Sequence, residues 1–123
     1  MLANPLPAIT DVLIIGRALV FRELISRLRM AGRSTWVAAS ILDVHWLMNS
    51  ARIRPAMVVI ELPTATSERA DLVNDLLEHR RLSHIPVVLL GAAPGEKIGL
   101  PNACIGLPFG ASAEDIESAL AQQ

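Results

Sequence analysis

Tyrosine is absent from this sequence, and two Trp and two Phe bring the aromatic content to only 3%. With so few rings, the side chains of Leu, Ile, Val, Met and Ala must build the core. The same scarcity argues against a nucleic-acid surface on which bases stack on aromatic side chains. We therefore expect no direct binding of nucleic acid.

Cysteine pairs, long apolar runs and a leader segment are missing as well. Cys104 is the single cysteine, which excludes an internal disulfide. Apolar runs such as residues 12–15 and 87–90 are far shorter than the roughly 20 residues of a membrane span. The amino-terminal residues show no basic region followed by an apolar stretch, the mark of a secretory signal. These absences predict a soluble, cytoplasmic protein that makes no membrane contact.

Length and composition indicate one folded domain over residues 1–123. The chain is 52% apolar, which is ample for a packed interior, and its net charge is −1. Residues 1–54 carry seven Arg against three acids, whereas residues 55–123 carry four basic residues against nine acids. This uneven distribution of charge could steer a charged partner. The simpler interpretation is that neighbouring helices and strands of opposite charge neutralise each other.

Five short apolar segments have the character of buried parallel strands, because their side chains are apolar on both faces. The predicted strands are residues 11–16, 34–39, 57–60, 86–90 and 103–106. Between the last two strands only 11 residues separate Gly91 from Ala103, and Pro94 and Pro101 are among them. A full helix with two loops does not fit there, so we predict a connection that is mostly loop.

Four segments show the three- and four-residue spacing of apolar side chains that indicates amphipathic helices. They are residues 19–30, 40–50, 69–82 and a segment that begins at Ser112. Ser40 and Ser112 are expected to be N-caps, the second with Asp115 at the third helical position. The predicted inward stripes are, in chain order, Val20, Leu24, Ile25 and Leu28; Leu42, Trp46 and Leu47; Leu72, Val73, Leu76 and Leu77; and Ile116, Ala119 and Leu120.

Strands that alternate with helices predict an α/β fold, in which right-handed crossovers cover both faces of a parallel sheet. Ligands of such sheets bind beyond the carboxyl ends of the strands. The candidate site residues are therefore those at or just after the strand ends, namely Gly16, Arg17, Glu61, Gly91 and Leu107. Neither of the glycine-rich phosphate-binding motifs occurs, so we expect no nucleotide cofactor.

Residues 12–25, 52–63 and 80–91, together with Leu107-Pro108-Phe109, resemble in order and spacing the receiver domains of two-component response regulators. The tripeptide stands where that family has Lys-Pro-Phe. The resemblance covers residues 9–121. It implies a doubly wound, flavodoxin-like sheet of five parallel strands in the order 2-1-3-4-5, here with a shortened or missing fourth helix.

The resemblance also implies a phosphorylation site, of which every residue has changed. Receivers hold Mg²⁺ with an acidic pair and phosphorylate an Asp, while a Thr or Ser and a Lys bind the phosphoryl group. Gly16 and Arg17 stand in place of the acidic pair. Glu61, Gly91 and Leu107 stand at the acceptor, hydroxyl and lysine positions. One carboxylate beside a guanidinium does not suit Mg²⁺, so we expect no bound metal and no phosphotransfer.

Glu61 allows two interpretations. A carboxylate one methylene longer than Asp could mimic phosphate and keep the domain switched on, but the hydroxyl and the lysine that would read it are missing. Arg17 at the start of a helix is unfavourable with the helix dipole, which makes a carboxylate partner more favourable than usual. We therefore predict an ion pair between Arg17 and Glu61.

Two further expectations concern the last strand. Cys104 stands where many receivers carry a switch aromatic, and we expect it to fill the core as a small apolar residue rather than to act as a reactive thiol. The Leu107–Pro108 peptide bond is expected to be cis, because the corresponding Lys–Pro bond of the resembled family commonly is.

The histidines and tryptophans carry weaker signals. His45, His79 and His84 lack the spacing of a metal site and are expected to be structural or exposed. Trp36 and Trp46 are expected in the core, although on the surface they would be anchors for a partner.

The carboxyl-terminal edge is the predicted interaction surface, as it commonly is in the resembled family. With no fourth helix, Ile98, Leu100 and Ile105 would need cover, because large exposed apolar patches are uncommon in monomers. We expect another chain to cover them, through residues 92–102 and the last helix, with Glu114 and Glu117 as a polar rim.

These observations predict a receiver-like signalling module, not an enzyme, that works independently of phosphorylation through protein–protein interaction or homodimerisation. It would be the regulatory domain of a larger signalling or transcription protein, or a stand-alone adaptor. The alternative is a sensor that binds a small molecule or anion in the emptied pocket, through Arg17 and the amides after Gly91. A third possibility is a working phosphoreceiver that uses Glu61.

Overall fold

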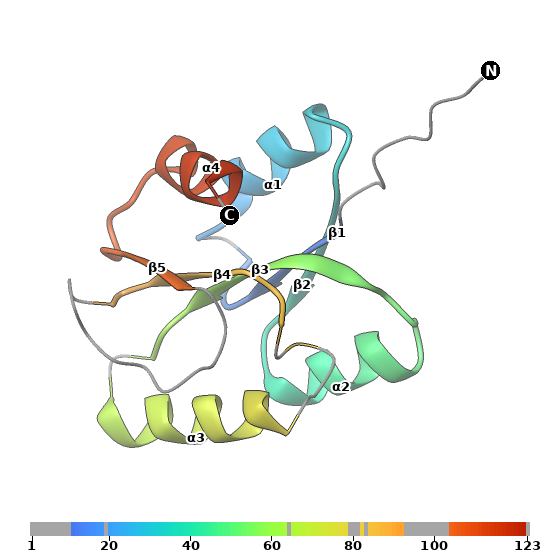
Figure 1. The fold of residues 1–123 in the computed structure, drawn as a ribbon, viewed down its shortest axis with the longest axis vertical. Coiled ribbons are helices and arrows are strands. Elements are labelled where there is room, and N and C mark those ends of the chain that lie inside the picture. Colours follow the sequence, from blue (N-terminus) through green and yellow to red (C-terminus); the bar gives the residue numbers. More distant parts are fainter. Residues whose placement is uncertain are drawn as a thin grey trace.

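In the computed structural model a parallel sheet lies between two pairs of helices (Figure 1). The structure describes residues 11–18, 20–63, 65–78, 82, 84–92 and 104–122. The strands are β1 (Asp11–Ile15), β2 (Ser34–Ala38), β3 (Pro55–Glu61), β4 (Val87–Leu90) and β5 (Cys104–Leu107), and they pair in the order β2-β1-β3-β4-β5. All four pairings are parallel. The predicted doubly wound, flavodoxin-like architecture is confirmed.

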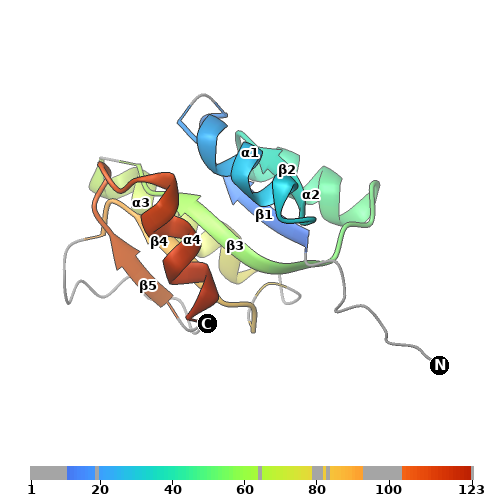
Figure 2. The same ribbon diagram turned by 90° about the horizontal axis from the view of Figure 1, so that it is seen from above.

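Four helices of the described residues cover the sheet, two on each face. They are α1 (Arg22–Met30), α2 (Ile41–Asn49), α3 (Thr66–Leu77) and α4 (Ala113–Ala121). Helices α1 and α4 lie together on one face, and α2 and α3 lie on the other (Figure 1). Seen from above in Figure 2, α4 lies over the β4 and β5 side of the sheet, and α1 lies closer to β1 and β2.

The sheet separates two apolar clusters, because successive side chains of a strand point to opposite faces. In β1, Leu13 and Ile15 pack toward α2 and α3, whereas Val12 and Ile14 pack toward α1 and α4. These four side chains are at most 4% exposed, and burial of such a side chain stabilises the fold by about 1.5–3 kcal/mol. The apolar character of the strands on both faces is thus explained by helices on both faces.

The two predicted N-caps are confirmed. The Ser40 hydroxyl accepts a hydrogen bond from the amide of Asp43 at the start of α2. Ser112 and Asp115 form a reciprocal capping box at the start of α4, with both hydrogen bonds at 3.1 Å. Each cap satisfies amides that the first helical turn would leave without a partner.

Two helices have different bounds from those predicted. The chain before α1 forms turns, in which the amides of Val20 and Phe21 donate to the carbonyls of Arg17 and Ala18. The helix therefore begins at Arg22 rather than at residue 19. Helix α3 covers residues 66–77, so it begins three residues before and ends five residues before the predicted helix over residues 69–82.

Some side chains predicted to face inward are exposed. In α2, Leu42 is 74% exposed and Trp46 is 60% exposed, while Val44, Leu47 and Met48 form the buried side. The prediction was wrong there because α2 has more apolar residues than one face of a helix can bury. The other exposed members of the predicted inward stripes and the predicted core are Val20, Trp36 and Leu77.

The connection between β4 and β5 was predicted to be mostly loop, and residues 93–103 lie outside the described part of the chain. No helix of the described residues has the length and apolar character needed to cross a lipid bilayer.

Candidate functional site

The carboxyl ends of the strands bring together the residues that the sequence predicted for a site. Gly16 follows β1, Glu61 ends β3, Gly91 follows β4 and Leu107 ends β5. Arg17 lies beside Gly16 and points its side chain back to Glu61. The predicted set is therefore one neighbourhood, and its composition decides what chemistry is possible there.

Gly16 sits against Glu61 more closely than any other residue type would allow. A Cβ atom on Gly16 would lie 2.8 Å from Cβ of Glu61 and 2.9 Å from the ring of Phe21. An aspartate or glutamate at this position would need the side chains of Glu61 and Phe21 to shift. The absence of an acidic side chain at Gly16 is therefore part of the packing and not an isolated sequence change.

Arg17 and Glu61 form the predicted ion pair. The backbone amide of Arg17 donates to Oε1 of Glu61 at 3.0 Å, and its Nε lies 3.2 Å from Oε1 and 3.0 Å from Oε2. The Nη2 atom donates to Oε2 as well. Both carboxylate oxygens of Glu61 are thus occupied by one residue, in the bidentate geometry that guanidinium and carboxylate favour.

The environment of the pair keeps both groups charged. The side chain of Glu61 is 10% exposed, whereas that of Arg17 is 75% exposed. The hydrogen bonds from Arg17 lower the pKa of the Glu61 carboxyl below its ordinary value, although partial burial acts in the opposite direction. The same interaction raises the pKa of Arg17. Glu61 therefore stays an anion that is already neutralised by its neighbour.

Arg69, which sequence reasoning did not select, links two strand ends at the same edge. From α3 its Nε donates to the carbonyl of Pro63 at 2.6 Å, and its Nη2 donates to the carbonyl of Gly91 at 3.0 Å. This half-buried guanidinium joins the segment after β3 to the segment after β4. Nothing in the local sequence distinguishes Arg69 from a solvated helix residue, because its partners come from two other parts of the chain.

Gly91, at the hydroxyl position of the resembled site, is covered by Phe109. Its φ of +96° is in a region that favours glycine, and a Cβ atom there would overlap the ring of Phe109. The amide of Gly91 donates to the carbonyl of Leu107 at 2.7 Å. This amide is therefore already engaged and does not offer a free donor to an anion.

The peptide bond between Leu107 and Pro108 is trans, since no peptide bond in the described residues is cis. The expectation taken from the resembled family was wrong. That expectation belonged to a Lys–Pro sequence, and Leu107 instead packs its half-buried side chain against the cluster under α1 and α4.

Beside the ion pair, the surface has an open depression of about 380 Å³. Its lining residues are Gly16, Arg17, Ala39, Glu61, Leu62, Pro63, Glu68 and Phe109. Two carboxylates border it, and one of them, Glu61, is fully engaged by Arg17. Across the described residues, no group of three His, Cys, Asp or Glu side chains is placed to hold a metal ion.

The residues at this edge do not fit the Mg²⁺ ion that the receiver fold implies. A hard divalent cation needs several oxygen ligands, and carboxylates supply its charge compensation. Here the guanidinium of Arg17 occupies both oxygens of Glu61, and Gly16 contributes no side chain. A cation at this position would have to displace the guanidinium of Arg17, because Glu61, one of the two carboxylates that border the depression, is already engaged by it.

Cys104, at the switch position, is not buried as the sequence predicted. Cys104 is exposed on β5 rather than buried in the core. Its neighbour Ile105 is half-buried against the cluster under α4. The expectation of core filling failed because β5 is the last strand of the sheet, where alternate side chains are less covered than in β4. Partial burial nevertheless raises the pKa of the Cys104 thiol.

Of the predicted interface residues, Ile105 is half-buried on β5, and the other four fall into three groups. Ile98 and Leu100 lie outside the described residues, as does the loop that contains them. Glu114 is exposed on α4, but Glu117 forms an ion pair with Arg27 of α1. Glu117 therefore joins two helices of this chain and is not a free rim residue.

The histidines lie on separate parts of the structure. His45 is half-buried on α2 and His84 is exposed before β4, while His79 lies outside the described residues.

Comparison with solved structures shows receiver domains with the same fold. The chemotaxis protein CheY4 of Vibrio cholerae superposes with a TM-score of 0.70 and 15% identity, over 94% of this chain and 98% of that chain. A response regulator receiver protein from Sinorhizobium medicae gives a TM-score of 0.64 and 19% identity, over 94% of each chain.

A third similar structure is the N-terminal domain of a response regulator/sensory box/GGDEF three-domain protein from Carboxydothermus hydrogenoformans, with a TM-score of 0.65 and 11% identity over 92% of each chain. No family model matches the sequence, and no curated protein matches it. At these identities the likeness establishes the fold. The chain has the receiver fold that its sequence resemblance implied.

Proposed function

We propose that this chain is a phosphorylation-independent signalling module, and not an enzyme, that acts through protein–protein interaction, with homodimerisation as its simplest form. The receiver fold supports the signalling role. The bidentate ion pair of Arg17 and Glu61 carries the proposal, because it occupies the place of the phosphoryl acceptor.

The ion pair removes two requirements of phosphoryl transfer. The acceptor carboxylate has no free oxygen, and its positive partner disfavours a second cation. The two positions that bind the phosphoryl group in receivers are unsuitable as well. The Phe109 ring covers Gly91 at the hydroxyl position, and Leu107 at the lysine position is apolar. The arrangement resembles a site fixed in one state rather than one awaiting a phosphoryl group.

Surface composition supports a role in protein interaction. Leu42 and Trp46 are largely exposed on α2, and their spacing of four residues makes them neighbours on the helix surface. Trp36 on the adjacent edge strand β2 is 37% exposed. Large aromatic side chains of this kind are enriched among the residues that dominate protein interfaces.

The Carboxydothermus structure supports the wider context. It is the N-terminal domain of a response regulator/sensory box/GGDEF protein with three domains. We propose that the present chain likewise serves as a regulatory domain of a larger signalling or transcription protein, or as an adaptor that holds a partner.

Incubation with acetyl phosphate and Mg²⁺, followed by intact-mass measurement, tests independence from phosphorylation. We expect no phosphoryl adduct on the wild-type chain. A stoichiometric mass gain that is lost in Glu61→Gln would contradict the proposal and would favour a working phosphoreceiver.

Light scattering over a range of protein concentrations tests homodimerisation. We expect a dimer that is weakened in Trp46→Ser and Leu42→Ser. Met30→Ser is the matched control, because Met30 is 86% exposed on α1, on the opposite face of the sheet. A monomeric mass at every concentration, with no change in either α2 variant, would rule out homodimerisation through α2.

The alternative sensor function at the carboxyl edge of the sheet has less support. Arg17 already binds Glu61, and the amide of Gly91 itself already donates to Leu107, while the amides of residues 93–103 lie outside the described part of the chain. An anion at this edge would have to compete with Glu61 for Arg17.

A further inference from the structure

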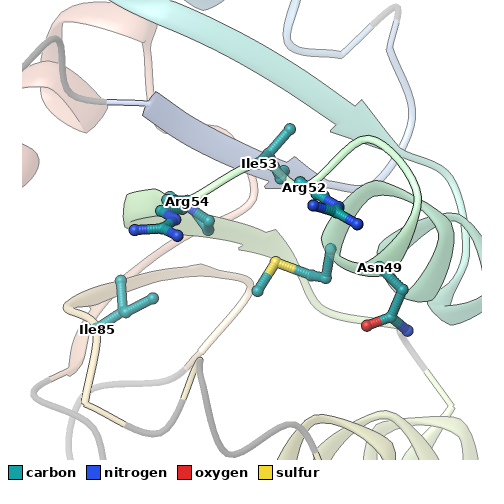
Figure 3. Close-up of a pocket in the computed structure, with 7 residues that line it drawn as sticks. Asn49, Arg52, Ile53, Arg54 and Ile85 are labelled. Atoms are coloured by element: carbon teal, nitrogen blue, oxygen red, sulfur yellow. The ribbon is translucent and has the colours of Figure 1, made fainter.

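A second pocket lies at the opposite edge of the sheet, where β3 begins and the chain enters β4. Its volume is about 590 Å³, within the roughly 300–1,000 Å³ typical of small-molecule sites. Arg52 and Arg54 line it with Asn49 from the end of α2, and Met48 and Ile85 are among its apolar lining residues. In Figure 3, Arg54 and Ile85 lie on one side of the pocket, and Arg52 and Asn49 lie on the other.

The guanidinium groups of Arg52 and Arg54 differ from those of Arg17, Arg27 and Arg69 in their surroundings. Arg17 and Arg27 each have a carboxylate partner, and Arg69 binds two carbonyls. For Arg52 and Arg54, the described part of the chain supplies neither a carboxylate nor a carbonyl partner. Among the described residues, no acidic side chain lines the pocket either. Two positive charges therefore border one cavity without compensation from that part of the chain.

The backbone of Arg52 adds an independent observation. The amide of Ile53 donates to the carbonyl of Leu47 at 3.1 Å, which closes the chain back onto the end of α2. Arg52 lies within this closure in the left-handed conformation, with φ of +56°. Glycine is the usual residue in that conformation because it has no side chain to strain. The presence of a long cationic side chain in this disfavoured conformation points to a use for that side chain.

We propose that this pocket binds a phosphate monoester with an apolar body. A phosphate monoester carries nearly two negative charges at neutral pH, which matches two guanidinium groups better than a single carboxylate does. The apolar body would contact Met48, Pro55 and Ile85, and the Asn49 amide would supply an additional hydrogen bond. This site is separate from the carboxyl edge of the sheet, so its failure would leave the Arg17–Glu61 interpretation untouched.

Titration calorimetry with phenyl phosphate tests the proposal, with inorganic phosphate, benzoate and benzyl alcohol as comparison probes. We expect phenyl phosphate to bind at least tenfold more tightly than each of the other three. Inorganic phosphate lacks the apolar body, benzoate carries one charge, and benzyl alcohol carries none. Equal affinity for benzoate would overturn the selection of a phosphate monoester, and no binding of phenyl phosphate at millimolar concentration would overturn the site.

Variants separate the pocket from general charge effects. Arg52→Gly and Arg54→Gln are each expected to weaken phenyl phosphate binding at least tenfold. Arg52→Gly should keep or raise the melting temperature, because glycine suits the left-handed conformation, so lost binding would not reflect unfolding. Arg22→Gln, which removes one charge from α1 on the other face of the sheet, should leave binding unchanged. Unchanged binding in both pocket variants, or equal loss in Arg22→Gln, would refute the proposal.

Discussion

The ring of Phe109 lies directly on the backbone of Gly91, so that a Cβ atom on this glycine would overlap Cζ of the ring. The contact closes the position where a receiver would place a hydroxyl beside the phosphoryl group. It also joins the end of β4 to the segment after β5, in addition to the hydrogen bond from the Gly91 amide to Leu107.

Replacement of Gly91 by Ala is expected to destabilise the protein more than replacement of Gly32 by Ala. Both glycines have positive φ, but a Cβ on Gly32 has nothing within 4 Å. Gly32→Ala should cost about 1–2 kcal/mol for backbone strain alone. Gly91→Ala should cost about 1 kcal/mol more, because the ring must also move. Urea unfolding of the two variants measures the difference.

The same comparison in a Phe109→Ala background isolates the ring. There the additional cost of Gly91→Ala should vanish and leave only the backbone strain. If the two glycine variants still differed by the same amount without the ring, the contact would not be the cause.

The stabilising effect of Glu61 is expected to depend on pH. Its pKa is lower in the folded state than its ordinary value of about 4.5, which applies in the unfolded chain. The stability gained from the Arg17 pair is therefore complete above that value and is lost as pH falls through the folded-state pKa. The difference in unfolding free energy between the wild type and Glu61→Gln should shrink between pH 7 and pH 3, as measured by urea unfolding.

Arg17→Gln provides the matched background for this test. Without the guanidinium, the effect of Glu61→Gln on the unfolding free energy should change much less over the same pH range. An effect that stays constant with pH when Arg17 is present would mean that Arg17 does not hold the carboxylate.

Loss of the capping box is expected to weaken α4 and its packing. Ser112→Ala removes the hydroxyl that accepts from the Asp115 amide and should cost about 1 kcal/mol. Ser118→Ala is the control within the same helix, because Ser118 is exposed and Ala favours helix. Thermal unfolding should show a lower midpoint for Ser112→Ala only. Equal midpoints for the two variants would contradict the role of the cap.

Cys104 is expected to react in the native protein, but slowly at neutral pH. The residue is exposed, and partial burial raises the pKa of its thiol above the ordinary value of about 9.0. Because the thiolate is the reactive form, the rate of labelling with iodoacetamide should keep rising above about pH 9 instead of levelling off there. The unfolded chain in urea should react faster than the native chain at pH 8. Complete protection in the native state would restore the interpretation of Cys104 as a core residue.

Much of the fold and part of the candidate site could be predicted from the sequence, because they depend on local signals. Apolar runs on both faces predicted parallel strands, and Ser112 with Asp115 predicted the start of the last helix. The pair of Arg17 and Glu61 was also predictable, since the carboxyl ends of neighbouring parallel strands meet at one edge. For the helix start and for the ion pair, the position of the residues at the end of a helix or strand determines which groups can meet.

Only the tertiary structure decided which of several apolar faces became buried. In α2, Leu42 and Trp46 were as plausible inward residues as Val44 and Met48, because periodicity fixes the spacing of a stripe and not the rotation of the helix on the sheet. The exposure of Cys104 likewise depended on its place in the last strand. Arg69 and Phe109 contact the site although they lie far from its other residues in the sequence. Such contacts arise from how whole elements pack, and that packing is set by the summed burial of two clusters rather than by any one residue.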